Sequence, residues 1–153
     1  MDETLETLID RVAIRELVDT YARGADRRDA VLEASVFADD GEVLLVSGDP
    51  ETTEPVDAIR GRDALVRTFE GLIAQYDATT YLNGQSSVRF ATADIAEGET
   101  YCLALHLLHA AGQRYLVTMS IRYLDRFERI DGRWRIAVRR LVIDWTDRSA
   151  SAP

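Results

Sequence analysis

The chain has 153 residues, of which 46% are hydrophobic, and its formal net charge is −9. This size predicts one globular domain with a real core, and the negative charge argues against binding to nucleic acid phosphates. The single cysteine, Cys102, excludes an intrachain disulfide, as is typical of a reducing compartment. The acidic N-terminus lacks the apolar core of a secretory signal, and no apolar run reaches the ~20 residues that span a membrane. We therefore expect a cytoplasmic protein with no membrane partner.

Helical periodicity dominates the first half of the chain. Apolar residues recur at helical spacing over about 4–23, where Gly24 is a candidate stop signal. The next elements are predicted, in chain order, to be a short helix at about 29–38, a short strand at 43–47 and a polar loop at 48–55. A third helix follows the letters GRD, in which Asp63 can cap the first turn. The loop at 48–55 is expected to cover the entrance of a site.

The second half of the chain is rich in β-branched and aromatic residues. Strands are predicted at about 85–92, 96–110, 113–128 and 133–146, and the letters AAGQ and IDGR between the last three are turn signals. Helices that come first and an antiparallel meander that comes last predict an α+β domain, with the helices on one face of a curved sheet. We expect a single domain over 1–147 and a flexible tail over 148–153.

Alternation divides the last predicted strand into two faces. Arg139, Leu141, Ile143 and Trp145 are expected on one face, and Trp134, Ile136, Val138 and Val142 on the other. Both faces are largely apolar, and a large exposed apolar patch is uncommon on a monomer. The pattern therefore predicts a homodimer through the outer face of the sheet.

Several motifs occur in an order that resembles a known family. These are AIRELVDTYARGADRRD, then FADDGEV, then GRDAL, and finally YLDRFERIDGRWRIAVRRLVIDW. Together they resemble the SnoaL-like branch of the NTF2-like superfamily over nearly the whole chain, with a pattern closest to the scytalone dehydratase and dehydrochlorinase-like members. The resemblance implies a cone, in which a strongly bent antiparallel sheet wraps around a long helix and leaves a deep apolar pocket. Family members include cofactor-independent dehydratases, dehydrohalogenases, polyketide cyclases, isomerases and hydroxylases, so the fold alone does not choose a reaction.

The resemblance implies a catalytic position for Asp26, which matches the aspartate that follows the first helix in the dehydratase members. The alternative is a carboxylate at the helix junction that pairs with Arg23 or Arg27. In those members the aspartate orients a histidine base, but the matching position here is Tyr81. A neutral tyrosine is a poor base at pH 7, although it can donate a hydrogen bond to an oxyanion. Alternatively, Tyr81 is simply an aromatic residue of the core or the rim.

Two further residues are candidates for the same pocket. His106 is expected to share the cavity face of its strand with Cys102 and could replace the missing base, unless it is a hydrogen-bonded core histidine. Arg139 matches an arginine of the dehydrochlorinase-like pocket and needs a partner if it is buried, for which Asp26 is the first choice. The alternatives are that Arg139 holds an anionic substrate or belongs to a purely structural ion pair.

The remaining expectations concern the ligand and the reaction. The candidates for the pocket wall are Tyr21, Cys102, Met119, Ile121, Tyr123 and Trp145. Their apolar character favours a hydrophobic small molecule, and the absence of phosphate-binding glycine motifs and of cysteine clusters predicts neither cofactor nor metal. We expect an enzyme that transfers protons as a lyase, isomerase or cyclase. The alternatives are a hydroxylase or epoxide hydrolase on the same fold, and a non-catalytic binding or assembly module.

Overall fold

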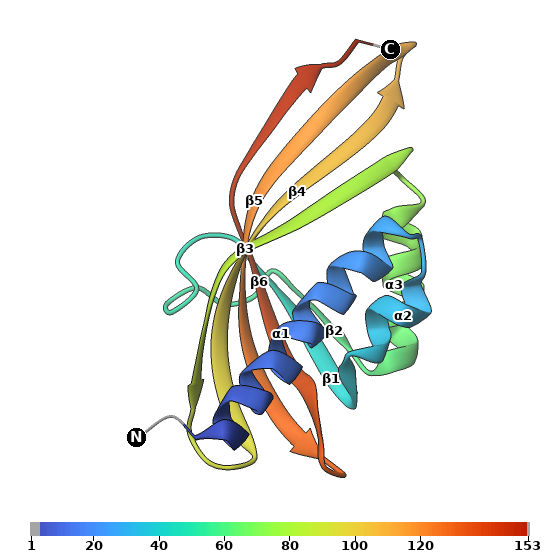
Figure 1. Cartoon of the computed structure of the whole chain (residues 1–153). Helices are drawn as coiled ribbons and strands as arrows, with labels where there is room; N and C mark the ends of the chain where they lie inside the picture. Colours follow the sequence, from blue (N-terminus) through green and yellow to red (C-terminus); the bar gives the residue numbers. More distant parts are fainter. Residues whose placement is uncertain (1–3, 153) are drawn as a thin grey trace.

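The computed structural model describes residues 4–152 of the chain. Figure 1 shows the helices on one side of a long curved sheet. In chain order the elements are α1 (Leu5–Asp26), α2 (Ala30–Ser35), β1 (Phe37–Val46), β2 (Asp57–Arg60), α3 (Arg62–Ile73), β3 (Ala78–Phe90), β4 (Ile95–Ala110), β5 (Gln113–Ile130) and β6 (Arg133–Ala150). The strands follow the order β2-β1-β6-β5-β4-β3. All neighbours are antiparallel except β1 and β6, which are parallel.

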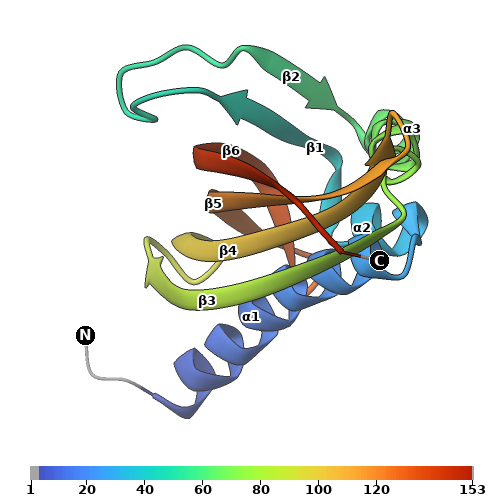
Figure 2. The same cartoon turned by 90° about the horizontal axis from the view of Figure 1, so that it is seen from above.

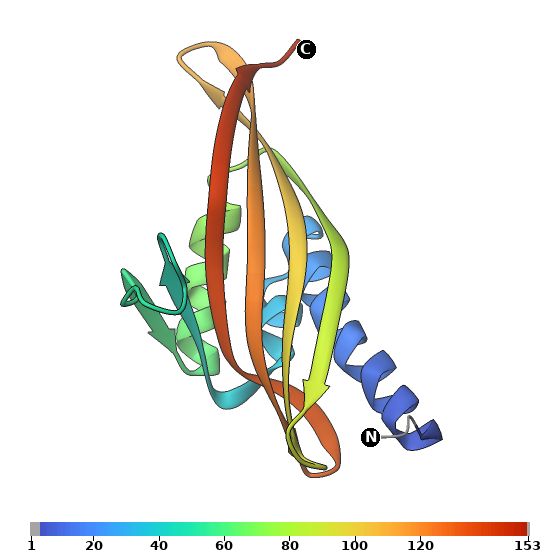
Figure 3. The ribbon, with the colours of Figure 1, turned by 90° about the vertical axis from the view of Figure 1, so that its left-hand side faces the viewer.

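The sheet bends around the helices, as the view from above makes clear (Figure 2). Helix α1 turns one stripe of side chains toward the concave face, and the buried members of this stripe include Ile14, Val18 and Tyr21. These residues recur every three or four positions, which places them on one side of a helix. The far ends of β4, β5 and β6 extend beyond the helices (Figure 3). The predicted α+β architecture, with helices on one face of a curved sheet, is confirmed.

Gly24 has a different role from the predicted one. Helix α1 continues through it and ends at Asp26, two residues further along. A Cβ atom at Gly24 would lie 2.6 Å from the backbone nitrogen of Glu33 and 2.7 Å from its Cα. Gly24 therefore allows α2 to pack directly on α1, and the prediction that it stops the helix was wrong.

Other boundaries also differ from the sequence predictions. Strand β1 begins at Phe37, where the second helix was expected to continue, and β2 was not predicted. The N-cap of α3 is Gly61, which has no side chain to cap the helix, whereas Asp63 lies inside the first turn. Strand β6 continues to Ala150, so residues 148–150 belong to the sheet rather than to a flexible tail.

A bulge changes the faces of β6. Phe127 of β5 pairs with Ile136, and the residue before it, Arg126, pairs with Val138. Ala137 therefore has no partner on β5. The extra residue resets the alternation. Arg139 therefore lies on the same face as Ile136, and the predicted division of this strand into two faces was wrong.

The convex face of the sheet is partly apolar and partly ionic. Arg122 makes two hydrogen bonds of 2.8 Å with the carboxylate of Asp144. Arg140, next to the inward-facing Arg139, donates to the backbone carbonyls of Pro50 and Thr53 at 2.9 and 3.2 Å. These bonds hold the loop over 48–55 on the convex side, away from the helices (Figure 1). The expectation that this loop covers the entrance of a site on the helical side was therefore wrong.

Candidate functional site

Asp26, the last residue of α1, joins this helix to strand β3. One carboxylate oxygen accepts a hydrogen bond of 2.9 Å from the Thr79 hydroxyl, and both oxygens lie 3.1 Å from the backbone nitrogen of Tyr81. The carboxylate is thus fixed by β3 and does not form the expected ion pair with Arg139. A carboxylate in this place sets the position of the Tyr81 backbone.

Arg28, two residues after Asp26, contacts the segment that includes the end of α3. The guanidinium group of Arg28 donates to the backbone carbonyls of Ile73, Tyr76 and Asp77 at 2.9–3.2 Å. Those carbonyls belong to the end of α3 and the segment after it, where helical carbonyls lack partners within the helix. The turn after α1 therefore fastens β3 through Asp26 and the end of α3 through Arg28.

Tyr81 and His106 form a hydrogen-bonded pair across β3 and β4. The Tyr81 hydroxyl lies 3.2 Å from Nε2 of His106, and the Tyr76 ring packs on the imidazole with centroids 4.4 Å apart. Burial raises the pKa of Tyr81 well above its ordinary value and lowers the pKa of His106. At neutral pH the phenol therefore keeps its proton and the imidazole is uncharged. The pair can donate a hydrogen bond, but it is a poor general base.

Arg139 pairs with Asp125 in the interior. Its Nε and Nη2 atoms lie 2.8 and 2.7 Å from the two carboxylate oxygens, and the side chains are 0% and 1% exposed. The guanidinium carbon lies over the rings of Tyr21 and Tyr123, at 4.3 and 4.0 Å from their centroids. The bulge in β6 brings Arg139 opposite Asp125. Of the expected alternatives, the structural ion pair describes this geometry.

A small cavity of about 70 Å³ lies between the three helices and the sheet. Its lining comes from α1, α2, α3 and the segment after it, β3, β5 and β6, and consists of Tyr21, Ala25, Glu33, Phe69, Leu72, Ile73, Tyr76, Thr79, Tyr81, Ile121, Tyr123 and Leu141. The centre of the cone is occupied by packed rings, with Tyr21 5.7 Å from Phe69 and 5.6 Å from Tyr123 between centroids. Sites that enclose a whole ligand usually measure ~300–1,000 Å³. This cavity can therefore enclose only a small group.

Some of the residues predicted from the sequence line this cavity, and the others lie outside its lining. Tyr81 lines the cavity, whereas Asp26, His106 and Arg139 contact the residues of its wall. Of the six candidates for the wall, Tyr21, Ile121 and Tyr123 line the cavity, while Cys102 and Met119 belong to the surrounding core. Trp145 is 52% exposed. A second bulge pairs it with Ser120, so it lies on the convex face, opposite the cavity.

Glu33 is a charged residue of the cavity that the sequence pattern did not identify. It belongs to α2, is only 4% exposed, and its Oε2 atom is buried without a hydrogen-bond partner. Burial raises the pKa of its carboxyl group to about 8, although a hydrogen bond with Tyr21 acts in the opposite direction. The sequence contains one signal of this position, because Glu33 is the only charged residue of the short apolar segment AVLEAS.

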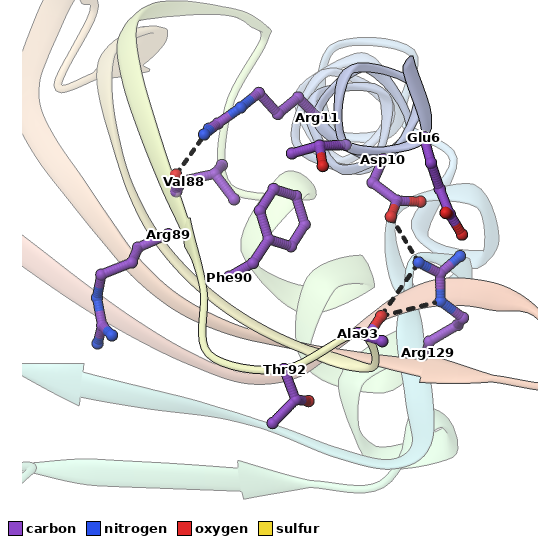
Figure 4. A pocket seen from close by; sticks show the side chains of 10 residues that line it. Glu6, Asp10, Arg11, Val88, Arg89, Phe90, Thr92, Ala93 and Arg129 are labelled. Carbon is purple, nitrogen blue, oxygen red and sulfur yellow. Dashed lines mark hydrogen bonds and ion pairs between the residues drawn. The ribbon is translucent and has the colours of Figure 1, made fainter. Parts of the chain in front are cut away.

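A larger groove of about 470 Å³ lies at the other end of α1 (Figure 4). Asp10 accepts hydrogen bonds from Arg129 at 2.6 Å and from the indole nitrogen of Trp134 at 2.9 Å. Arg11 donates to the backbone carbonyl of Val88 at 2.7 Å. The polar groups of the groove thus bind each other and hold α1 against the sheet.

The structure also bears on metal binding and membrane insertion. Within residues 4–152, no three His, Cys, Asp or Glu side chains are grouped so that they could hold a metal ion. Over the same residues, no helix has the length and apolar character that crossing a membrane requires.

Comparisons with known proteins agree with this architecture. No curated protein sequence matches the chain. Among solved structures, the hexachlorocyclohexane dehydrochlorinase LinA type 2 is similar with a TM-score of 0.82 and 24% identity, over 97% of each chain. A candidate scytalone dehydratase from Novosphingobium aromaticivorans has a TM-score of 0.73 and 24% identity, over 93% of this chain and 89% of that one. These similarities show the NTF2-like cone fold.

One further similarity concerns a protein whose function is not known. This protein, from Mycobacterium tuberculosis, has a TM-score of 0.73 and 26% identity, over 91% of this chain and 74% of that one. The model of the SnoaL-like domain matches residues 6–140, which is most of the sequence. The chain therefore belongs to the SnoaL-like domain family.

Proposed function

We propose that this protein is a cofactor-free enzyme that moves a proton beside the carbonyl group of a hydrophobic small molecule, as a lyase, isomerase or cyclase. The observation that carries the proposal is the Tyr81–His106 pair, in which the Tyr81 hydroxyl at the cavity wall lies 3.2 Å from Nε2 of His106. When Nε2 of His106 carries the imidazole proton and donates it to the phenol oxygen, the Tyr81 proton is free for a hydrogen bond to the oxyanion that forms when a proton leaves the neighbouring carbon.

The surroundings of Tyr81 are suited to this task. Its backbone is fixed by Asp26, and His106 limits the rotation of its hydroxyl group. A hydrogen-bond donor that is already oriented does not have to reorganise when negative charge develops on the substrate oxygen. Its hydrogen bond is strongest where water is excluded. Asp26 and His106 thus act as positioning residues, and Tyr81 is the group that meets the substrate.

The size of the cavity restricts how a substrate binds. A volume of about 70 Å³ encloses a carbonyl group and its neighbouring carbons, so the rest of a larger substrate stays outside. Leu72 is 49% exposed and marks the mouth, while Tyr21 and Tyr123 form the buried floor. We infer that the reacting end of the substrate enters beside Leu72 and that its apolar remainder lies across the end of α3.

Exchange of carbon-bound hydrogen for deuterium tests the proposal without knowledge of the natural substrate. Acetone and cyclohexanone in D₂O serve as probes, and ¹H NMR follows the loss of the signal of the protons beside the carbonyl. Wild-type protein is expected to accelerate this loss above the rate in buffer. Tyr81→Phe should lower the acceleration by about 100-fold, the effect of removing one oxyanion donor.

Tyr101→Phe is the matched control, because Tyr101 lies on the next strand and on the convex face. It should leave the exchange rate unchanged. Equal rates for the Tyr81 and Tyr101 variants would remove Tyr81 from the reaction. No acceleration by the wild type with either ketone would contradict the proposed function.

A non-catalytic binding or assembly module is the second candidate function. The rings that fill the centre of the cone favour it, since they leave only about 70 Å³. Saturable binding of cyclohexanone with no exchange would support this alternative.

We also propose that two copies associate through the convex face. Leu82 and Leu103 are directly paired there, and Trp145 lies nearby on β6, with exposed fractions of 56%, 38% and 52%. A second copy would cover this apolar area.

A further inference from the structure

The proposed reaction needs a group that accepts a proton, and the sequence candidates do not supply it at the cavity. The oxygens of Asp26 are occupied by Thr79 and the backbone of Tyr81, and Nε2 of His106 is paired with the Tyr81 hydroxyl. Neither residue lines the cavity. A base has to reach the proton directly or through one water molecule.

From the geometry of α2 we propose that Glu33 is the group that takes the proton from the substrate and returns it. Glu33 is the only carboxylate among the described residues that line the cavity. Its side chain is 4% exposed, and its Oε2 atom has no partner in the protein. A buried oxygen atom without a partner is unusual in a native structure and points to a ligand that supplies one. This inference rests on the proposed function and adds the base that it requires.

The position of Glu33 is enforced by the packing of α2 on α1. Gly24 permits a backbone contact so close that a Cβ atom would lie 2.6–2.8 Å from three Glu33 atoms. Tyr21 of α1 lines the same cavity and lowers the pKa of the carboxyl group from one side. The carboxyl group is therefore held in the cavity with one oxygen free to react.

The charged and titratable groups around Glu33 adjust its proton affinity. Burial raises the pKa of the carboxyl group, Asp26 on α1 raises it further, and the hydrogen bond with Tyr21 and the charge of Arg139 lower it. Tyr81 of β3 completes the set and keeps its own proton. The result is a carboxyl group with a pKa of about 8, which exchanges its proton near neutral pH.

The step balances without any further reactant. The C–H bond beside the carbonyl breaks, the proton forms an O–H bond on the Glu33 carboxylate, and the electron pair moves to the carbonyl oxygen. The resulting enolate accepts a hydrogen bond from Tyr81. In D₂O the Glu33 carboxyl group exchanges with solvent and returns a deuteron to carbon, which restores the ketone and the carboxylate.

The same exchange assay tests this role through its pH dependence. After subtraction of the rate in buffer, the wild-type rate is expected to rise with pH and to level off above about 8, because only the carboxylate form is a base. Glu33→Gln should lower this rate at least 100-fold, and Glu33→Asp should retain part of it with a displaced pH midpoint. Glu70→Gln, an exposed change on α3, should leave the profile unchanged.

An infrared measurement reads the proton on Glu33 without any substrate. The wild type should show the carbonyl stretch of a protonated carboxylic acid at pH 6 that disappears at pH 9.5, and Glu33→Gln should lack this band. Unchanged exchange in a folded Glu33→Gln protein, with Tyr81→Phe still slow, would overturn the role of Glu33 and leave the proposed function standing. No exchange by the wild type would instead contradict the proposed function itself. A wild-type spectrum without the pH-dependent band would also overturn the assignment.

Discussion

Arg139 and Asp125 face each other across β6 and β5 with two hydrogen bonds of 2.8 and 2.7 Å, and both side chains are fully enclosed by the core. Asp125→Asn removes the charge that neutralises the guanidinium group. Breaking a buried pair in this way should lower the free energy of unfolding by about 3–5 kcal/mol. Urea denaturation followed by circular dichroism measures the change.

Arg122 and Asp144 offer a matched control for that variant. They also lie on β5 and β6 and also form two hydrogen bonds, but their side chains are 23% and 29% exposed. Asp144→Asn should therefore cost at most about 1 kcal/mol. Similar urea midpoints for the two variants would show that burial of the Arg139–Asp125 pair does not determine how much the pair contributes to the free energy of unfolding.

Substitutions at two helical glycines are expected to change the stability of the fold in opposite directions. Gly24→Ala forces a Cβ atom against the backbone of Glu33 and should destabilise the fold by about 1–3 kcal/mol, as overpacking does. Gly71→Ala, in α3, meets no atom within 4 Å and should stabilise the fold by about 0.5–1 kcal/mol, because alanine favours the helix. Thermal unfolding of both variants tests this, and a stabilising Gly24→Ala would contradict the close contact between α1 and α2.

The buried carboxyl group of Glu33 should make stability depend on pH. Its pKa is about 8 in the folded state and near 4.5 in the unfolded chain, so the folded state holds more protons between these values. Stability should therefore fall as pH rises from about 5 to 8, with a slope of at most about 1.4 kcal/mol per pH unit. Glu33→Gln should remove this slope. Urea midpoints at pH 5, 6.5 and 8 for both proteins provide the measurement, and parallel curves would contradict the raised pKa.

The proposed dimer predicts a particle of twice the 17.2 kDa chain mass at micromolar concentration. Leu103→Glu places a charge in the exposed apolar part of the convex face and should yield a monomer. Leu8→Glu, at an exposed position on α1, is the control and should leave the mass unchanged. Light scattering distinguishes these outcomes, and a monomeric wild type would exclude the dimer.

The sequence predicted the arrangement of helices and strands better than it predicted the contacts of the site. Periodicity and turn signals suffice for α1 and for the long hairpins, because those signals are local. The partner of Arg139 could not be found in this way, since a single unpaired residue, Ala137, shifts the register that decides it. A second bulge moves Trp145 to the opposite face for the same reason. Glu33 was missed because its role depends on the packing of α2 against Gly24, which the local pattern does not reveal.

The hydrogen bonds of Arg28 have a consequence for how the wall of the cavity can open. The backbone carbonyls of Ile73, at the end of α3, and of Tyr76 and Asp77, in the segment after it, accept hydrogen bonds from this one side chain. Ile73 and Tyr76 also line the cavity. Any outward swing of that wall has to release all three bonds together. Widening of the cavity on this side therefore requires these hydrogen bonds at the protein surface to break.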